Sequence, residues 1–293
     1  MFRKILSLAG LVLAGLALMG LALGCMPFEP GTDELPDPNA ASTSAVNTAV
    51  DSLTAEMGRD WSCIGPLSTA QNVVRSNANA ARLVQSLQLL SLVAGTPAVG
   101  SVRACAQRDV NCTNPATPDI TIDPQGWVDL PLYDGFDGYL EITGPEIVST
   151  ILFYQDALST ASRRDTTPLG VVERQLLPML TSALGTQQDP QVGLVYLRAF
   201  DCNNDAALGV RYSIDKASVP FYFVSGLPSS AVTETEGSGL GGFINVASGI
   251  AVLNAALSNG AKPIALPKTV LVRPNWMTGL RIIPALTPQD DAQ

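Results

Sequence analysis

The chain has no histidine among its 293 residues, and this absence removes several kinds of chemistry at once. Ser-His-Asp catalysis, Cys-His catalysis and metal sites with a histidine ligand cannot be built within it. A Ser-Lys nucleophile remains in principle, but after Lys4 the only lysines are Lys216, Lys262 and Lys268. The sequence therefore predicts a protein that is not an enzyme.

Positive charge and metal-binding cysteine pairs are also scarce. The formal net charge is −9, and an acidic surface repels phosphate backbones, which argues against nucleic-acid binding. No C-x-x-C pair occurs, which together with the missing histidine argues against a zinc site. Only 15% of residues are charged, whereas there are 25 glycines and 21 prolines. This composition is typical of short strands and turns.

The one long apolar run lies at the N-terminus. Arg3 and Lys4 precede an uncharged stretch over residues 5–24, which ends at Cys25. This order is typical of a secretory signal, with a single transmembrane anchor as the alternative. The letters "LALGC" resemble the lipobox of bacterial lipoproteins. That resemblance implies acylation of Cys25 by a diacylglyceryl thioether and an amide-linked chain such as palmitate, which together supply the two hydrophobic signals of a stable anchor.

The cysteine count agrees with export. If Cys25 carries lipid, four cysteines remain, an even number suited to two disulfides in an oxidising compartment. Three pairings of these four are open. We favour a local loop between Cys105 and Cys112, which leaves Cys63 to pair with Cys202.

Composition and periodicity divide the chain into segments. The Pro-, Ser- and acid-rich stretch after Cys25 reads as a flexible tether. The spacing of apolar residues predicts a helix over 168–185, in which Pro178 would produce a kink or a break and Gly185 an end. The expected organisation is a signal peptide (1–24), a lipidated cysteine with tether (25–57), a first β-sandwich (58–155), a helical linker (156–190), a second β-sandwich (191–286) and a disordered tail (287–293).

Strand signals fill both expected sandwiches. The stretch "LVQSLQLLSLV" fits a strand or a short helix, and "DITIDPQGWVDLPL" predicts a hairpin with its turn at residues 123–126. Further strands are expected at "GYLEITG", "VSTILFYQ", "GLVYLRAFDC" and "TVLVRPNWMTGLRIIP". A weak self-similarity with a period of about 100 residues suggests two copies of one β module.

The order of these motifs resembles the carboxypeptidase regulatory-like domain, a transthyretin-like β-sandwich found in bacterial surface proteins. The matching residues of the first copy are Gly95, Pro97, Gly100, Val102, Ala104, Cys105, Asp123, Gly126, Leu130, Leu132 and Asp137–Ile142. The second copy matches at Asp201, Gly209, Val210, Gly239, Phe243, Val246 and Gly249. The resemblance implies a mainly β fold of two tandem sandwiches and transfers no catalytic residues. Hydrolases among relatives of this fold depend on histidine.

Acidic residues near "PLYDGFDGYLEITG" are the main candidates for a ligand site. Asp123, Asp134, Asp137 and Glu141 could offer oxygen ligands to Ca²⁺, although EF-hand spacing is missing. The favoured interpretation is that aspartate and glycine serve turns. Nearby aromatic residues could form a sugar platform or belong to the core. No cofactor other than this candidate Ca²⁺ is expected.

A G-x-G-x-x-G pattern at Gly237, Gly239 and Gly242 follows a polar, acidic segment. The dinucleotide fingerprint needs a strand before it and a helix after it, so hairpin glycines are the favoured interpretation.

These observations predict a lipid-anchored protein of the cell envelope, at the outer membrane or cell surface. We expect its folded part to be a non-catalytic structural or interaction module in adhesion or assembly. Its expected partners are the lipid bilayer and an envelope protein or glycan. Binding of carbohydrate or peptidoglycan is the alternative function.

Overall fold

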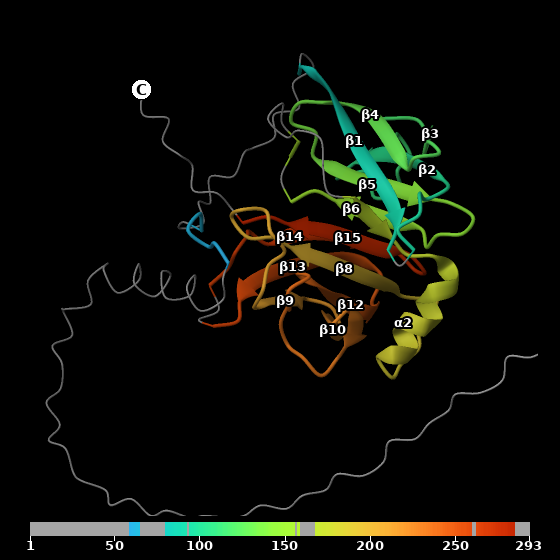
Figure 1. The fold of residues 1–293 in the computed structure, drawn as a ribbon. Helices are drawn as coiled ribbons and strands as arrows, with labels where there is room; N and C mark the ends of the chain where they lie inside the picture. The colour runs from blue at the N-terminus through green and yellow to red at the C-terminus, as the bar shows by residue number, and fades with distance from the viewer. Residues whose placement is uncertain are drawn as a thin grey trace, which may run out of the picture. The chain divides into compact units, whose positions relative to one another are not determined.

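The computed structural model describes residues 59–64, 80–92, 94–155, 157–158, 168–259 and 262–284. Strands dominate these residues, which confirms the predicted mainly β fold (Figure 1). The expected signal peptide (1–24), the lipidated cysteine with its tether (25–57) and the tail (287–293) lie outside the described residues.

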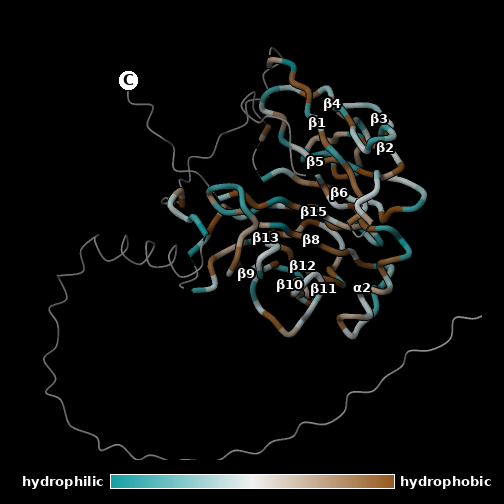
Figure 2. Tube along the Cα trace, in the orientation of Figure 1, coloured by the Kyte–Doolittle hydropathy of each residue, from teal (hydrophilic) through white to brown (hydrophobic). Residues whose placement is uncertain are grey.

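The first half of the described chain contributes strands to two sheets. In chain order these strands are β1 (Arg82–Ser91), β2 (Ser101–Ala106), β3 (Ile120–Thr121), β4 (Trp127–Tyr133), β5 (Gly138–Thr143), β6 (Thr150–Phe153) and β7 (Leu169–Val171). The stretch "LVQSLQLLSLV", whose periodicity fits either a strand or a short helix, contributes most of β1. Its buried residues alternate, as at Leu87 and Leu89, which is the period of a strand with one face in the core. Hydrophobic and hydrophilic residues are interleaved along the strands (Figure 2).

The second half contributes the remaining strands. They are β8 (Gly193–Ala199), β9 (Val210–Ile214), β10 (Val219–Val224), β11 (Leu227–Ser229), β12 (Leu240–Val246), β13 (Gly249–Leu257), β14 (Lys268–Val272) and β15 (Met277–Ile282). The strands expected at "GLVYLRAFDC" and "TVLVRPNWMTGLRIIP" are present as β8, β14 and β15. Strands β10 and β11 were not anticipated from the sequence.

One nine-stranded sheet runs through both halves, in the order β11-β10-β12-β8-β15-β6-β5-β2-β3. The last strand of the chain, β15, lies between β8 and β6 and pairs with both in parallel, with Met277 opposite Leu194 and Thr150. The first and second halves of the described chain therefore share one central sheet, and the pairing of β6 with β15 joins their strands.

Two smaller sheets cover opposite faces of this central sheet. The sheet β4-β1-β7 packs on a core that includes Leu152, and the sheet β14-β13-β9 packs on a core that includes Ile151 and Phe153. Neighbouring residues of a strand point to opposite faces, so these adjacent β6 residues place the two covering layers on opposite sides.

The segment expected to form one long helix is divided. Leu169–Val171 forms β7, which pairs in parallel with the end of β1, and the 3₁₀ helix η1 (Arg174–Leu176) leads into α2 (Leu177–Ala183). Pro178 lies in the first turn of α2, where its missing N–H costs nothing. Gly185 follows with φ +69°, as expected for the end of a helix.

The predicted hairpin at residues 119–132 is wrong, although its turn is present. The backbone N–H of Asp123 donates to the carbonyl of Trp127 at 2.8 Å, which closes the turn. The strands on either side enter different sheets, because β3 pairs with β2 whereas β4 pairs with β1. The turn is thus a corner between two layers.

The repeat suggested by the sequence does not hold strand by strand. The stretch from β4 into β5 runs from a covering sheet to the central sheet, whereas its counterpart from β12 into β13 runs from the central sheet to a covering sheet. Residues 59–64, expected at the start of the first sandwich, contribute Trp61 and Ile64 to the core that contains the strands of the second half.

Candidate functional site

Four acidic residues were predicted as a candidate Ca²⁺ loop, and the structure does not bring them together. Asp123 Oδ1 accepts hydrogen bonds from the backbone N–H groups of Gln125 and Trp127, at 2.8 and 2.7 Å, so it stabilises the corner before β4. Asp137 lies before β5, and its Oδ1 is 3.5 Å from Lys268 Nζ. Asp134 lies in the turn after β4, where its backbone N–H donates to the carbonyl of Ala81.

Glu141, the fourth of these residues, lies inside the protein. Its side chain is 1% exposed, and Arg103 Nε and Nη2 donate to Oε2 at 2.8 and 2.5 Å. Arg273 Nη1 lies 2.5 Å from the other oxygen, Oε1. Both carboxylate oxygens therefore face guanidinium groups, an environment that repels a cation such as Ca²⁺.

The residues of this buried ionic cluster come from distant parts of the chain. Arg103 of β2 lies directly opposite Glu141 of β5 in the antiparallel register, and Arg273 follows β14. The hydrogen bond to Glu141 raises the pKa of Arg103. Sequence reasoning missed both arginines. The alternation of "SVRACA" against "GYLEIT" signals the first of them, and nothing local signals the second.

The same cluster holds the loop that the Cys105–Cys112 disulfide closes. Arg273 Nη2 donates to the carbonyl of Val110 at 2.7 Å, and the hydroxyl of Tyr139 donates to the carbonyl of Asp109 at 2.5 Å. Burial raises the pKa of Tyr139. Within the described residues, the one group of three potential metal ligands joins both sulfurs of this loop with Glu141. Because the sulfurs are bonded to each other, they are not available as thiolate ligands.

Two disulfides are present, Cys63–Cys202 and Cys105–Cys112, which is the pairing that the sequence favoured. The first joins residues 139 apart and fastens the 59–64 segment to the end of β8. Asp201 reinforces this junction, since its carboxylate accepts from the backbone N–H groups of Asp60 and Asn203 at 3.2 and 3.0 Å.

The aromatic residues near the candidate loop divide between core and partial exposure. Phe136 and Tyr139 are both 0% exposed, so they belong to the core rather than to a sugar platform. Trp127 and Tyr133 are half-buried on β4.

The G-x-G-x-x-G glycines lie at the start of a strand. Gly239 has φ +65°, and β12 begins at the next residue, Leu240, with no helix following. A Cβ at Gly242 would lie 2.0 Å from the carbonyl oxygen of Val195 on the neighbouring strand. These glycines therefore serve strand packing and do not form a dinucleotide fingerprint.

A Ser-Lys nucleophile is disfavoured by geometry. Ser213 and Lys216 have the S-x-x-K spacing, which sequence reasoning overlooked, but Ser213 is exposed near the end of strand β9. Lys216 lies in the bend after β9, so the two residues are not three apart on a helix, where this spacing would place both side chains on one face.

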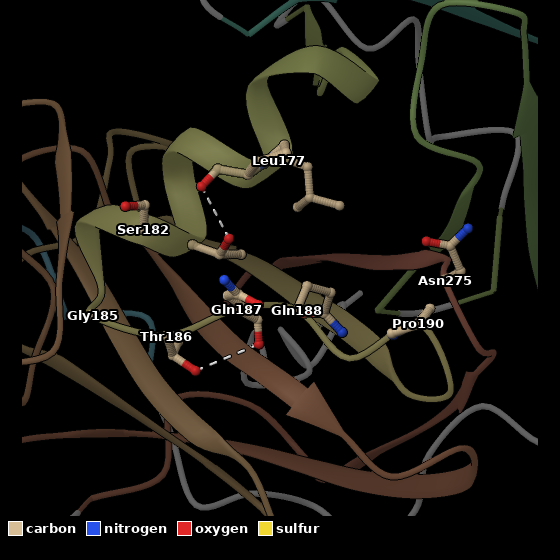
Figure 3. A pocket seen from close by; sticks show the side chains of 10 residues that line it. Leu177, Ser182, Gly185, Thr186, Gln187, Gln188, Pro190 and Asn275 are labelled. Atoms are coloured by element: carbon tan, nitrogen blue, oxygen red, sulfur yellow. Dashed lines mark hydrogen bonds between the residues drawn. The ribbon is translucent and has the colours of Figure 1, made fainter.

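A hollow of about 540 Å³ lies beside α2 (Figure 3). None of its lining residues is charged, and they combine amide and hydroxyl side chains with leucine and proline. Gln188 Nε2 donates to the carbonyl of Gly193 at 3.2 Å. The lining consists of Leu177, Pro178, Thr181, Ser182, Gly185, Thr186, Gln187, Gln188, Pro190 and Asn275.

Comparisons with known proteins give weak structural likenesses. No protein-family model and no curated protein sequence matches the chain. Among solved structures, the chain is similar to the Bacillus anthracis TIE protein (TM-score 0.25, 10% identity, 71% of this chain and 34% of that chain). It thus spans about a third of that protein. A Streptococcal ancillary pilin gives a TM-score of 0.23 and 12% identity over 69% of this chain and 68% of that chain. The shaft pilin SpaA from Lactobacillus rhamnosus GG gives 0.22 and 9% over 71% and 99%.

No helix in the described part of the chain has the length and apolar character required to cross a bilayer.

Proposed function

We propose that this protein is exported, anchored in the cell envelope by lipid on Cys25, and used there as a non-catalytic structural or interaction module. The observation that carries the proposal is the pairing of the other four cysteines into two disulfides. Structural disulfides are typical of exported proteins and are rare in a reducing cytosol. The pairing leaves Cys25 as the odd cysteine, within the lipobox-like "LALGC".

Several features support a role without catalysis. Glu141 is the buried carboxylate of the cluster, and guanidinium groups engage both of its oxygens, so neither oxygen is presented to a substrate. The chain has no histidine to act as a base for its serines. The ionic cluster and the Cys63–Cys202 disulfide instead fasten distant segments together, which suits a module that must keep its shape outside the cell.

The test is mass spectrometry of the N-terminal peptide of the full chain, recovered from the membrane fraction of a bacterial host. We expect the peptide to begin at Cys25 and to carry diacylglycerol and an amide-linked acyl chain. The Cys25→Ser variant should lose the lipid and leave the membrane fraction, while both disulfides remain in non-reducing peptide maps. An unmodified Cys25, or an intact signal peptide in the wild type, would refute the anchor.

A second candidate function, recognition of an uncharged glycan, is favoured by the hollow beside α2. Its amide and hydroxyl side chains can donate and accept, and the absence of charge suits a neutral polyhydroxylated ligand. We expect the protein to be retained on peptidoglycan or polysaccharide. The Thr186→Trp variant, which fills the hollow, should abolish retention. Thr269→Trp, at an exposed position of β14, is the matched control, and equal retention of both variants would exclude this site.

A further inference from the structure

Two arginines lie side by side on one face of the central sheet. Arg198 of β8 and Arg281 of β15 are direct partners in the parallel register. These two strands are neighbours near the middle of the central sheet (Figure 1). Residues of β8 alternate between faces, and Arg198 shares its face with Leu194, which belongs to the core beneath α2. The two guanidinium groups therefore emerge on the face opposite the sheet β14-β13-β9.

Phe200 holds both cations in place. The Cζ atom of Arg198 lies 5.0 Å from the centroid of the Phe200 ring, and that of Arg281 lies 4.4 Å from it. The ring is 2% exposed, so it is fixed by packing. Such contacts between a guanidinium group and an aromatic ring are attractive, and they restrict the rotamers of long side chains. Two like charges are thus preorganised around one ring.

A small cavity opens at these arginines. Its volume is about 130 Å³, roughly the space of four water molecules, and its walls include Leu152, Tyr196, Leu240 and both arginines. None of its lining residues is acidic, although the chain has 26 aspartates and glutamates. The walls are otherwise apolar or aromatic for the most part, an environment that strengthens the attraction of an anion for a guanidinium group.

Arg198, which lines this cavity, has one side-chain donor without an acceptor in the described part of the chain. Its Nε is buried and has no hydrogen-bond acceptor among the described residues. A buried charged donor without an acceptor is costly, so an acceptor supplied by a ligand would bring a gain. Arg281 Nη2 donates to Asn204 Oδ1 at 3.4 Å, which orients this second guanidinium group.

We propose that this cavity is a binding site for a small oxyanion, a phosphate-like or carboxylate group. Arg198 makes the direct contact through its guanidinium group, whose planar fork matches two oxygens of such a group. Arg281 supplies a second positive charge, and Phe200 positions both. The ligand would relieve the repulsion between the two arginines. The proposal stands apart from lipid anchoring and from the glycan hollow beside α2, and it can fail without affecting either.

The experiment is isothermal titration of the full chain, purified in detergent, with inorganic phosphate, sulfate and acetate in turn. The buffer contains neither phosphate nor carboxylate, and sodium chloride keeps the ionic strength constant. We expect saturable binding of at least one of the three oxyanions. The comparison of acetate with phosphate and sulfate decides between a planar and a tetrahedral group.

The Arg198→Met variant should bind about tenfold more weakly or worse, the loss of at least one charge-assisted hydrogen bond. Arg211→Met removes one exposed guanidinium group from β9 and should leave the affinity unchanged. If Arg198→Met fails to fold by circular dichroism, Arg198→Lys replaces it, because lysine keeps the charge but lacks the fork and should still bind several-fold more weakly. The proposal is overturned if no oxyanion binds saturably to the wild type, or if the folded Arg198 variant binds as tightly as Arg211→Met.

Discussion

The Glu141→Gln substitution tests whether the buried ionic cluster holds the two halves of the protein together. Glutamine keeps the shape of the side chain and one acceptor oxygen but removes the negative charge. Arg103 and Arg273 would then face each other across a neutral amide. The side chain at position 141 is only 1% exposed, so water has little access to the space between them. The repulsion between the two guanidinium groups would no longer be compensated.

The size of the effect follows from burial. Removing one partner of a fully buried ion pair costs about 3–5 kcal/mol. The side chains of Arg103 and Arg273 are 34% and 19% exposed, so water screens part of the remaining positive charge. We therefore expect a loss of about 2–3 kcal/mol in the free energy of unfolding. For a domain of this size that corresponds to a drop in melting temperature of about 5–10 °C.

The assay is thermal unfolding followed by circular dichroism at neutral pH, with Glu146→Gln as the matched control. Glu146 is exposed and lies just beyond β5, so the same chemical change there should alter the free energy of unfolding by less than about 0.5 kcal/mol. Equal and small shifts for the two variants would refute the reasoning. Arg273→Met in the Glu141→Gln background should cost less than it does in the wild type, because it relieves the repulsion.

The disulfides and one buried hydroxyl give two further expectations. Replacing Cys63 and Cys202 by alanine should lower the free energy of unfolding by about 5 kcal/mol, and replacing Cys105 and Cys112 should lower it by about 2.4 kcal/mol. The difference arises from loop-closure entropy, because the loops span 139 and 7 residues. Urea denaturation measures both losses, and the reverse order would contradict this expectation. Burial raises the pKa of Tyr212 well above 10, so above pH 10 the unfolded state loses a proton that the folded state keeps, and stability falls as pH rises. Tyr212→Phe should therefore flatten the alkaline loss of stability by up to about 1.4 kcal/mol per pH unit, and parallel curves for variant and wild type would rule this out.

The sequence predicts well those features that depend on neighbours along the chain. Strand β5 and the aspartate-glycine turn before it follow from alternation and turn chemistry, and the end of α2 at Gly185 follows from the need for a positive φ. The short spacing of Cys105 and Cys112 likewise led to the correct disulfide pairing, because it favours a local loop and leaves Cys63 to pair with Cys202.

The sequence predicts poorly those features that depend on which strands meet. Leu169–Val171 has helical spacing, yet it forms a strand because the end of β1 offers it backbone partners. The corner at Asp123 looks like a hairpin from its letters alone, because a turn does not specify which sheet each flanking strand will join. The shared central sheet depends on β15 pairing with β6, strands more than 120 residues apart in sequence.

The same limit explains why the sequence could group Glu141 with the acidic turn residues as candidate Ca²⁺ ligands. Glu141 lies four residues after Asp137 in the chain, and on that basis the two seemed to belong to one loop. The strand that begins at Gly138 turns the Glu141 side chain into the interior, where its partners come from β2 and from the end of β14. A carboxylate on a mostly buried strand needs a cation, and the sequence does not show which arginine will reach it. Charged side chains in this protein therefore gather where distant segments meet, at Glu141 and again beside Phe200, and not at the acidic turns.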